Sequence, residues 1–254
     1  MSVLSTQQYG ILQLTLHRPQ LRNSISSEMF NALSERLLRA SSDPSVRVVL
    51  LKGNDQIFSA GADVQETFKN RQEISNASRR FFRILRNFAK PIVAEVHGIA
   101  VAEAFAMLLY CDFVYVNENA AFSIPATALA RTPRFGFTAL LPLAAGLPKI
   151  NEKILLAEPI SAQEALDMHL ITAIYSDEDL TKVVAAKVAR LAVLPTQAIQ
   201  ASKKLLRHMQ NQYLNEQLEL EEQTYNQQTQ TFEAKEALSA FLEGRKPVFV
   251  KDED

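Results

Sequence analysis

Two short segments of the sequence suit chemistry carried by the main chain. Segment 58–63 reads Phe-Ser-Ala-Gly-Ala-Asp and follows an apolar stretch that ends at Gly53. Small side chains let a ligand approach the backbone closely. Segment 90–100 leads through Gly98 toward a predicted apolar helix, whose start presents free N–H groups and a positive dipole end. Both segments suit an anion or a developing oxyanion, although the first segment is equally typical of a tight turn.

Side chains that usually act as nucleophiles or metal ligands are scarce. Cys111 lies in the apolar run 105–111 without a cationic neighbour that would lower its pKa, so we expect a buried, inert thiol. The four histidines lie far apart and have no cysteine or acidic partner at ligand spacing. The sequence therefore predicts no metal site and no resident cofactor. A single cysteine also excludes an internal disulfide and is typical of a reducing compartment.

Alternating strands and helices must position the two segments. Period-two and β-branched patterns predict strands at 11–16, 46–51, 92–96, 113–116 and 170–175. Helical spacing predicts helices at 29–38, 73–88, 104–110 and 162–168. The serines at 24, 26 and 27 suit an N-cap for the first of these helices, and Ser161 with Glu164 forms a capping box that opens the last. Strands that alternate with helices indicate an α/β fold, with a mostly parallel sheet covered by helices.

The C-terminal part has a different composition. Pro195 suits the first turn of a helix that runs toward His208. Residues 213–242 contain no Gly or Pro and are rich in Gln and Glu, so we expect one long helix there. A mostly polar helix is not stable alone and must pack on the core or on another subunit. We therefore divide the chain into an α/β core, residues 1–195, and a C-terminal helical region, residues 196–254.

Bulk properties exclude several classes of protein. The 254 residues contain 27 Lys and Arg and 28 Asp and Glu, which gives a formal net charge of −1. Without a basic field or a polybasic run, no nucleic-acid partner is expected. No apolar stretch approaches the roughly 20 residues that span a bilayer. We expect a cytoplasmic protein without membrane contact.

The sequence motifs, in their order along the chain, resemble those of the crotonase superfamily of enoyl-CoA hydratases and isomerases. The resemblance rests on His17-Arg18-Pro19 with Asn23 and on segments 58–63, 90–112, 160–171 and 240–249. It spans nearly the whole chain and implies a crotonase-like spiral of β-β-α units followed by C-terminal helices. It also implies an acyl-CoA thioester as ligand or substrate. The implied assembly is a homotrimer or a dimer of trimers, with the C-terminal region at the trimer contact.

The resemblance implies an oxyanion hole made of two backbone N–H groups. Such donors stabilise the charge that develops on the thioester oxygen when the α-carbon gains or loses a proton. By motif position, the donors are the N–H groups of Ala62 and Glu103. The family usually has a run of glycines at 102–104, where this chain has Ala-Glu-Ala. Glu103 keeps the N–H but adds a bulky, charged side chain to the expected site.

The acid and base positions also depart from the family's pattern. The two glutamates of the hydratases align with Ala106 and Ala126, and the acidic residue of the isomerases aligns with Arg134. Alanine cannot transfer a proton, and arginine stays protonated. Arg134 can pair with Glu103 or with a carboxylate of the substrate, or it can be a surface residue at the start of a helix.

Glu103 has two interpretations. It can swing over the α-carbon as a base, or it can cap its helix, where a carboxylate in the first turn is favourable by about 0.3–1 kcal/mol. The ordinary dipole effect favours the cap. The first hypothesis for function is an acyl-CoA-acting enzyme of the hydratase or isomerase type, which the chain-long resemblance and Ala62 support. The alternative is a catalytically silent protein that binds acyl-CoA or serves as a structural subunit, which the loss of the three acidic positions and of the glycine run supports.

The resemblance also implies where the coenzyme A part of the ligand binds. The backbone positions expected to contact it are Ala60, Ala62, Asp63 and Val64. Family members often use a basic residue on the closing helix of a neighbouring subunit to bind the phosphates. Phe241 matches the aromatic residue of that helix, and the usual basic position is Gly244. Arg245 and Lys246 follow directly and are the candidates for phosphate binding.

Overall fold

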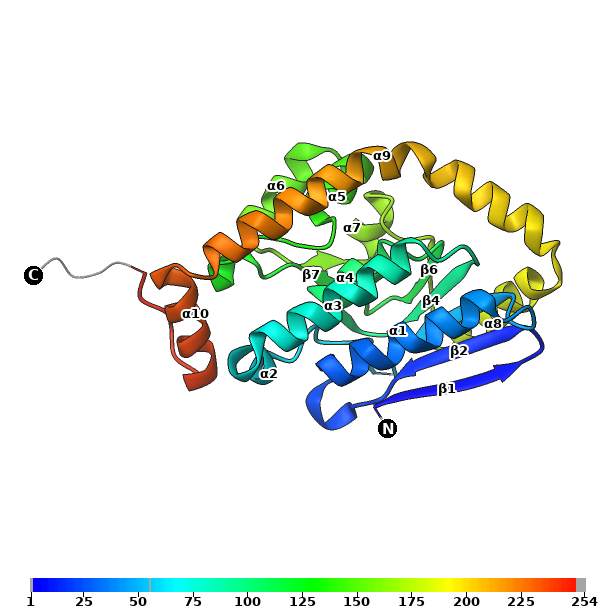
Figure 1. Ribbon diagram of the computed structural model, residues 1–254, viewed down its shortest axis with the longest axis horizontal. Coiled ribbons are helices and arrows are strands. Elements are labelled where there is room, and N and C mark those ends of the chain that lie inside the picture. Colours follow the sequence, from blue (N-terminus) through cyan, green and yellow to red (C-terminus); the bar gives the residue numbers. More distant parts are fainter. Residues whose placement is uncertain (1, 55, 250–254) are drawn as a thin grey trace, which may run out of the picture.

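The computed structural model describes residues 2–54 and 56–249, which form two sheets with helices packed around them (Figure 1). The larger sheet has six strands in the order β1-β2-β3-β4-β6-β9. Their bounds are β1 (Val3–Gln8), β2 (Ile11–Leu16), β3 (Val48–Lys52), β4 (Ile92–Val96), β6 (Phe113–Asn117) and β9 (Ala173–Tyr175). β1 and β2 pair antiparallel, and each of the other neighbouring pairs is parallel. The predicted α/β class with a mostly parallel sheet is confirmed.

The larger sheet is buried on both faces, as strand β3 illustrates. The covering helices are α1 (Ser27–Ser42), α3 (Arg71–Arg86) and α8 (Asp177–Val193). Val48 and Leu50 pack in one apolar cluster with residues of α8. Val49 and Leu51 belong to the main core with residues of α1 and α3. Because successive side chains of a strand point to opposite faces, a continuous apolar run fits a strand that is covered on both sides.

The smaller sheet brings the two sequence segments together. Its three strands, in the order β5-β7-β8, are β5 (Ile99–Val101), β7 (Ala121–Ser123) and β8 (Ile160–Ser161). Beside β5, single bridges join Ser59 to Ala100 and Ile25 to Ala62. β5 leads directly into α4 (Glu103–Leu108). The loop after β3 therefore runs along the strand that delivers the start of α4.

The remaining helices surround this junction. They are α2 (Val64–Lys69), α5 (Phe137–Ala145), α6 (Leu147–Leu155), α7 (Ala162–Asp167), α9 (Thr196–Gln228) and α10 (Phe232–Glu243), with short 3-10 turns at Pro19–Leu21 and Thr127–Leu129. The predicted capping box of Ser161 and Glu164 opens α7. Among the described residues, none of the helices combines the length and apolar character needed to cross a membrane.

The prediction of one helix over 213–242 is wrong, because two helices share that range. α9 begins after Pro195 and ends at Gln228, and α10 begins after a short break. The reason is a cap: the Thr231 side chain accepts a hydrogen bond from the N–H of Ala234 at 3.2 Å and starts a new helix. In Figure 1, α9 crosses the top of the molecule and α10 turns down at its end.

The C-terminal helix was expected to pack either on the core or on another subunit, and α9 packs on the core of its own chain. Lys203 forms an ion pair with Asp112 at 2.7 Å near one end, and Leu214 and Tyr225 are buried further along. Leu214 belongs to the main apolar core. The predicted boundary at residue 195 coincides with the start of α9, and the division into two domains stays a prediction.

Candidate functional site

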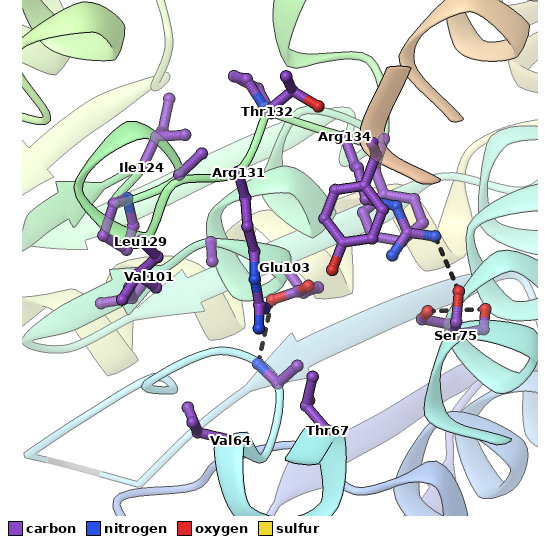
Figure 2. Close-up of a pocket in the computed structure, with 18 of the residues that line it drawn as sticks. Val64, Thr67, Ser75, Val101, Glu103, Ile124, Leu129, Arg131, Thr132 and Arg134 are labelled. Atoms are coloured by element: carbon purple, nitrogen blue, oxygen red, sulfur yellow. Dashed lines mark hydrogen bonds between the residues drawn. The ribbon is translucent and has the colours of Figure 1, made fainter. Parts of the chain in front are cut away.

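A cavity with a volume of about 260 Å³ lies where the loop after β3, the start of α4, α3 and the segment 124–135 meet (Figure 2). Its walls differ in chemistry. Val101, Ile124 and Leu129 form an apolar wall, whereas Ser75 and Arg134 lie on the other side in the same view. The cavity thus combines space for an apolar group with polar side chains that can orient a ligand.

The two predicted oxyanion-hole residues meet in this cavity. The N–H of Ala62 donates a hydrogen bond of 3.1 Å to Oε2 of Glu103 (Figure 2). Glu103 is the first residue of α4, and no side chain caps this helix. Glu103 therefore lies in the first helical turn, as the capping interpretation expects, but its carboxylate is bound by Ala62 and not by an N–H of its own helix.

Two backbone conformations bring these residues together. Gly61 has a φ of +88°, and a Cβ at this position would lie 2.7 Å from the carbonyl oxygen of Val101. Ala102, directly before α4, has a φ of +49° and a ψ of −116°. Such a conformation favours glycine, and a residue with a Cβ is strained there. The glycine-like geometry implied for 102–104 is thus present at Ala102 although the glycine is not.

A buried hydrogen-bond network fixes the loop that carries Ala62. The side chain of Asn23, which is fully buried, donates to the carbonyl oxygens of Ile57 and Phe58 at 3.1 and 3.2 Å. The Ser59 hydroxyl donates to the Asn23 carbonyl oxygen at 2.7 Å and accepts from the N–H of Gly61 at 3.1 Å. The position of the Ala62 N–H is therefore set by the scaffold.

Asp63 supports the loop and does not face the cavity. Its carboxylate accepts from the N–H of Glu66 at 3.0 Å as the N-cap of α2 and pairs with Arg18 at 2.6 Å. Burial alone would raise the pKa of Asp63, but the hydrogen bonds from Glu66 and Arg18 outweigh burial and lower it. Of the four positions predicted to contact coenzyme A, the cavity lining contains Ala60, Ala62 and Val64.

The positions predicted to match the family's acids and bases are Ala106, Ala126 and Arg134, and the structure places them differently. Ala106 is fully buried inside α4, whereas Ala126 lines the cavity. Arg134 is 7% exposed, so the expectation of a surface residue is wrong. Nη2 of Arg134 donates to Glu222 at 2.8 Å and to Ser75 at 3.1 Å, so its partner is Glu222 and not Glu103.

The reason for this outcome is the packing of α9. Glu222 and Tyr225 are three residues apart, so they lie on the same face of that helix. The guanidinium of Arg134 lies 4.2 Å from the centre of the Tyr225 ring. It also lies 4.5 Å from the ring of the neighbouring residue in the sequence, Phe135. A helix far away in the sequence thus supplies both the charge and the aromatic surface that hold Arg134.

Comparison with known proteins assigns the chain to a family. The family model described as Enoyl-CoA hydratase/isomerase matches residues 6–252. The chain belongs to the enoyl-CoA hydratase/isomerase family. It is 32% identical to the 2,3-dehydroadipyl-CoA hydratase of Escherichia coli (strain K12), over 97% of this chain and 98% of the relative. It is 29% identical to the 1,2-epoxyphenylacetyl-CoA isomerase of the same strain, over 97% of each chain.

Solved structures agree with this assignment. The crystal structure of an enoyl-CoA hydratase/isomerase from Pseudoalteromonas atlantica T6c has a TM-score of 0.91 and 31% identity, and the match covers 98% of this chain and 100% of that chain. The predicted crotonase-type α/β fold with a C-terminal helical region is therefore confirmed.

Several cavity residues of this family member were not predicted from the sequence. Arg71, Ser75, Arg131 and Tyr225 line the cavity. Arg71 and Ser75 lie on the first turns of α3, at the edge of the predicted helix 73–88, and Tyr225 comes from the distant α9. No motif marks these positions in the sequence, because tertiary packing alone brings them to the cavity.

The C-terminal candidates lie at different distances from the site. Phe241 lines the cavity of its own chain, with 55% of its surface exposed. Arg245 pairs with Glu236 at 2.5 and 2.9 Å and with Glu243 at 2.6 Å, and these carboxylates raise the pKa of its guanidinium. Lys246 is exposed. Neither basic residue lines the cavity, and their binding of coenzyme A phosphates stays a prediction.

Cys111 is buried, and burial raises the pKa of its thiol to about 12. The expected inert character of this thiol follows from that environment, because the thiolate is the nucleophile. Within residues 2–54 and 56–249, no cluster of three or more His, Cys, Asp and Glu side chains is arranged to hold a metal ion.

Proposed function

We propose that this chain binds an acyl-CoA thioester in the cavity and catalyses proton transfer at its α-carbon. The N–H groups of Ala62 and Glu103 polarise the thioester carbonyl, and the Glu103 carboxylate is the acid–base group. The contact between Ala62 and Glu103 carries the proposal. An N–H that holds a carboxylate oxygen at 3.1 Å inside the cavity is aimed at a negatively charged oxygen, which is the requirement for an oxyanion-hole donor.

Substrate binding requires an exchange of partners at Ala62. The thioester oxygen takes the place of the Glu103 carboxylate and accepts the Ala62 hydrogen bond. The N–H of Glu103 is the second donor, because the first N–H of a helix has no acceptor within that helix. The displaced carboxylate lies beside the carbonyl and therefore beside the α-carbon, where it can accept a proton.

The composition of the cavity favours isomerisation over hydration. Two carboxylates share the acid and base roles in hydration, and this chain has Ala106 and Ala126 at those positions. A single carboxylate is sufficient to remove a proton from the α-carbon of a β,γ-unsaturated thioester and return it to the γ-carbon. The double bond then lies between the α- and β-carbons, and no atom is gained or lost. Among the described residues, Glu103 is the only carboxylate of the lining.

A second candidate function is a catalytically silent acyl-CoA-binding protein or structural subunit. The same contact favours it, because in this structure Glu103 occupies the Ala62 donor that a thioester needs. The two functions differ in whether Glu103 transfers a proton after it is displaced.

Exchange of the α-proton separates the two candidates. A saturated acyl-CoA incubated with the protein in heavy water is expected to lose its α-proton signal in NMR spectra, and a β,γ-enoyl-CoA is expected to gain the absorbance of a conjugated thioester. Glu103→Gln, which keeps the shape but cannot act as a base, is expected to slow both reactions by about 10²- to 10⁴-fold. Binding without exchange in the wild-type protein supports the silent homologue. A folded protein that binds no acyl-CoA contradicts the proposed enzyme and the silent acyl-CoA-binding protein, and leaves only the structural subunit.

The proposed assembly is a homotrimer or a dimer of trimers. Leu205, Leu206, Met209 and Tyr213 of α9 are between 62% and 84% exposed. Leu205, Met209 and Tyr213 recur every four residues and thus lie along one side of the helix, and an exposed apolar stripe of this kind is typical of a surface that contacts another subunit. Sedimentation equilibrium is expected to give three or six copies, and Leu206→Glu with Met209→Glu is expected to dissociate them. A stable wild-type monomer contradicts the proposal.

A further inference from the structure

The cavity lining carries more positive charge and more hydrogen-bond donors than its acceptors can satisfy. Among the described lining residues, Arg71, Arg131 and Arg134 are cationic, and Glu103 alone is anionic. A guanidinium group has several N–H donors and no acceptor. Glu222, outside the lining, neutralises Arg134. Two guanidinium charges therefore face one carboxylate, and that carboxylate is engaged by Ala62.

On the side of the cavity that carries Thr132 and Arg134, here called the cationic wall, two buried polar atoms have no hydrogen-bond partner. They are Nε of Arg134 and the hydroxyl oxygen Oγ1 of Thr132. Arg134 itself is 93% buried, since only 7% of its surface is exposed. A buried donor without a partner lowers stability, and nearly all such groups in folded proteins are satisfied. The same wall is therefore one hydrogen-bond acceptor group short.

Arg71 and Arg131 have little compensation for their charges. Nη1 of Arg71 donates to the carbonyl oxygen of Thr229 at 3.3 Å, which is a neutral partner. Burial lowers the pKa of Arg71, and the positive charges of Arg131 and Arg134 lower it further against the opposing effects of Tyr225 and Glu222.

The guanidinium of Arg131 makes no hydrogen bond or ion pair with the part of the chain that the structure describes, and only its backbone N–H is bonded, to the carbonyl oxygen of Ala126. Figure 2 shows this side chain extending from its loop into the cavity, toward Glu103. A guanidinium group that extends into a cavity and forms no ion pair there is available to bind an anionic group of a ligand.

A carboxylate of the ligand fits these groups. It is planar, accepts several hydrogen bonds, donates none when ionised, and matches the fork of a guanidinium group. Figure 2 shows Thr132 and Arg134 across the cavity from Val64, which belongs to the backbone expected to hold coenzyme A. The anion is therefore expected on the acyl part of the ligand and not on the coenzyme.

We infer that the acyl group of the substrate carries a carboxylate, which Arg131 and Arg71 bind with the free donors of Arg134 and Thr132. The substrates are then the CoA monothioesters of dicarboxylic acids. This inference rests on the proposed function and specifies its substrate class. A neutral acyl chain leaves the cationic wall without a counter-ion, whereas a terminal carboxylate satisfies its charge and its free donors together.

The test compares matched ligands by calorimetric titration. One series contains the saturated dicarboxylic monothioesters from succinyl-CoA to suberoyl-CoA, and the other contains the neutral thioesters from butyryl-CoA to octanoyl-CoA. At the best chain length, the dicarboxylic thioester is expected to bind at least about 10-fold more tightly than its neutral counterpart, as one charge-assisted pair predicts. Coenzyme A alone is titrated as a third ligand.

Variants assign the preference to the cavity. Arg131→Gln and Arg71→Gln are each expected to weaken binding of the dicarboxylic thioester about 10-fold and to change binding of the neutral thioester much less. Arg131→Lys, which keeps the charge but not the fork, is expected to lie between wild type and Arg131→Gln. Arg83→Gln, an exposed position of α3 outside this cavity, is the matched control and is expected to change neither affinity. Thermal unfolding of each variant confirms that it is folded.

The outcomes separate this inference from the proposed function. Equal affinity for the two series overturns the inference and leaves acyl-CoA binding intact. A loss of affinity for coenzyme A alone in Arg131→Gln also overturns it, because the arginines then bind the phosphates. A preference that both arginine variants retain overturns it as well. If wild-type protein binds neither series, the proposed function fails together with the inference.

Discussion

The two functional halves of the cavity are built to different degrees. The loop that presents the Ala62 N–H is held by Asn23, Ser59 and the close approach of Gly61 to the next segment. The positions predicted for acids and bases hold alanine at 106 and 126. The geometry of a main-chain N–H depends on a network of several residues, whereas a proton-transfer group is a single side chain. Under the proposed function, one substitution therefore removes an acid or base, while the main-chain donor keeps its position.

The largest effect is expected where the network behind Ala62 is broken. Asn23→Ala leaves the carbonyl oxygens of Ile57 and Phe58 and the N–H of Arg18 without their buried partner. We expect a loss of about 3 kcal/mol in the free energy of unfolding, measured by urea titration. Asn87→Ala, at an exposed site after α3, is the control and is expected to change stability by less than about 0.5 kcal/mol. A loss below about 1 kcal/mol for Asn23→Ala contradicts the role assigned to the network.

Removing the Glu103 carboxylate is expected to affect the two halves in opposite directions. Glu103→Ala frees the Ala62 N–H, so we expect acyl-CoA to bind about 10-fold more tightly because no charge-assisted hydrogen bond must be broken first. The same variant is expected to lose α-proton exchange. Glu152→Ala, an exposed position of α6, controls for the general loss of a negative charge. Unchanged or weaker binding in Glu103→Ala shows that Glu103 does not compete with the thioester.

A smaller effect is expected at the joint between β5 and α4. Ala102→Gly relieves the strain of a positive φ at a residue with a Cβ. The relief exceeds the entropic cost of glycine in the unfolded chain, so we expect a gain of about 1 kcal/mol in the free energy of unfolding. Ala201→Gly, on the exposed surface of α9, is expected to lose about 1 kcal/mol by the ordinary helix propensity. A loss of stability in Ala102→Gly contradicts the assignment of strain.

The smallest effect concerns pH at the end of β4, the strand that leads to α4. The Glu95 carboxylate, 3.4 Å from Nε2, raises the pKa of His97 above its ordinary value of 6.5, against the effect of burial and with help from the hydrogen bond to Asp177. The stabilising contribution of His97 is fully present below about pH 6.5 and is lost as the pH rises through the raised value. Urea titrations from about pH 6 to about pH 9 are expected to show this decline. His97→Gln is expected to remove it, and an unchanged pH profile in that variant argues against a charged His97.

Local patterns were sufficient for the elements that position the site. Strand β4 has the predicted bounds, and the serine cap and the capping box lie where the sequence predicts them. The short strands β5, β7 and β8 were missed, because two or three residues give no periodic signal. The break between α9 and α10 was missed because Thr231 in a run without Gly or Pro gave no strong stop signal.

For the site, sequence reasoning named Ala62 and Glu103, whose role as main-chain donors stays a prediction, and missed the arginines Arg71 and Arg131. Ala62 and Glu103 lie in contact because both belong to motifs with fixed local geometry. Arg71 and Arg131 reach the cavity through the packing of α3 and through a loop with no motif. The partner of Arg134 comes from Glu222, which is 88 residues away in the sequence. Contacts of this range follow from tertiary structure and cannot be read from local patterns.

The contribution of the C-terminal helices to the cavity also has a consequence for synthesis. Most of the lining lies between residues 60 and 137, whereas Tyr225 and Phe241 follow much later in the chain and are made after the rest of the lining. Domains begin to fold from the N-terminal side while the chain is still being made. A nascent chain that has completed both sheets still has an open groove in place of the cavity. The capacity to enclose a ligand is therefore acquired only after α9 and α10 have been made and have docked.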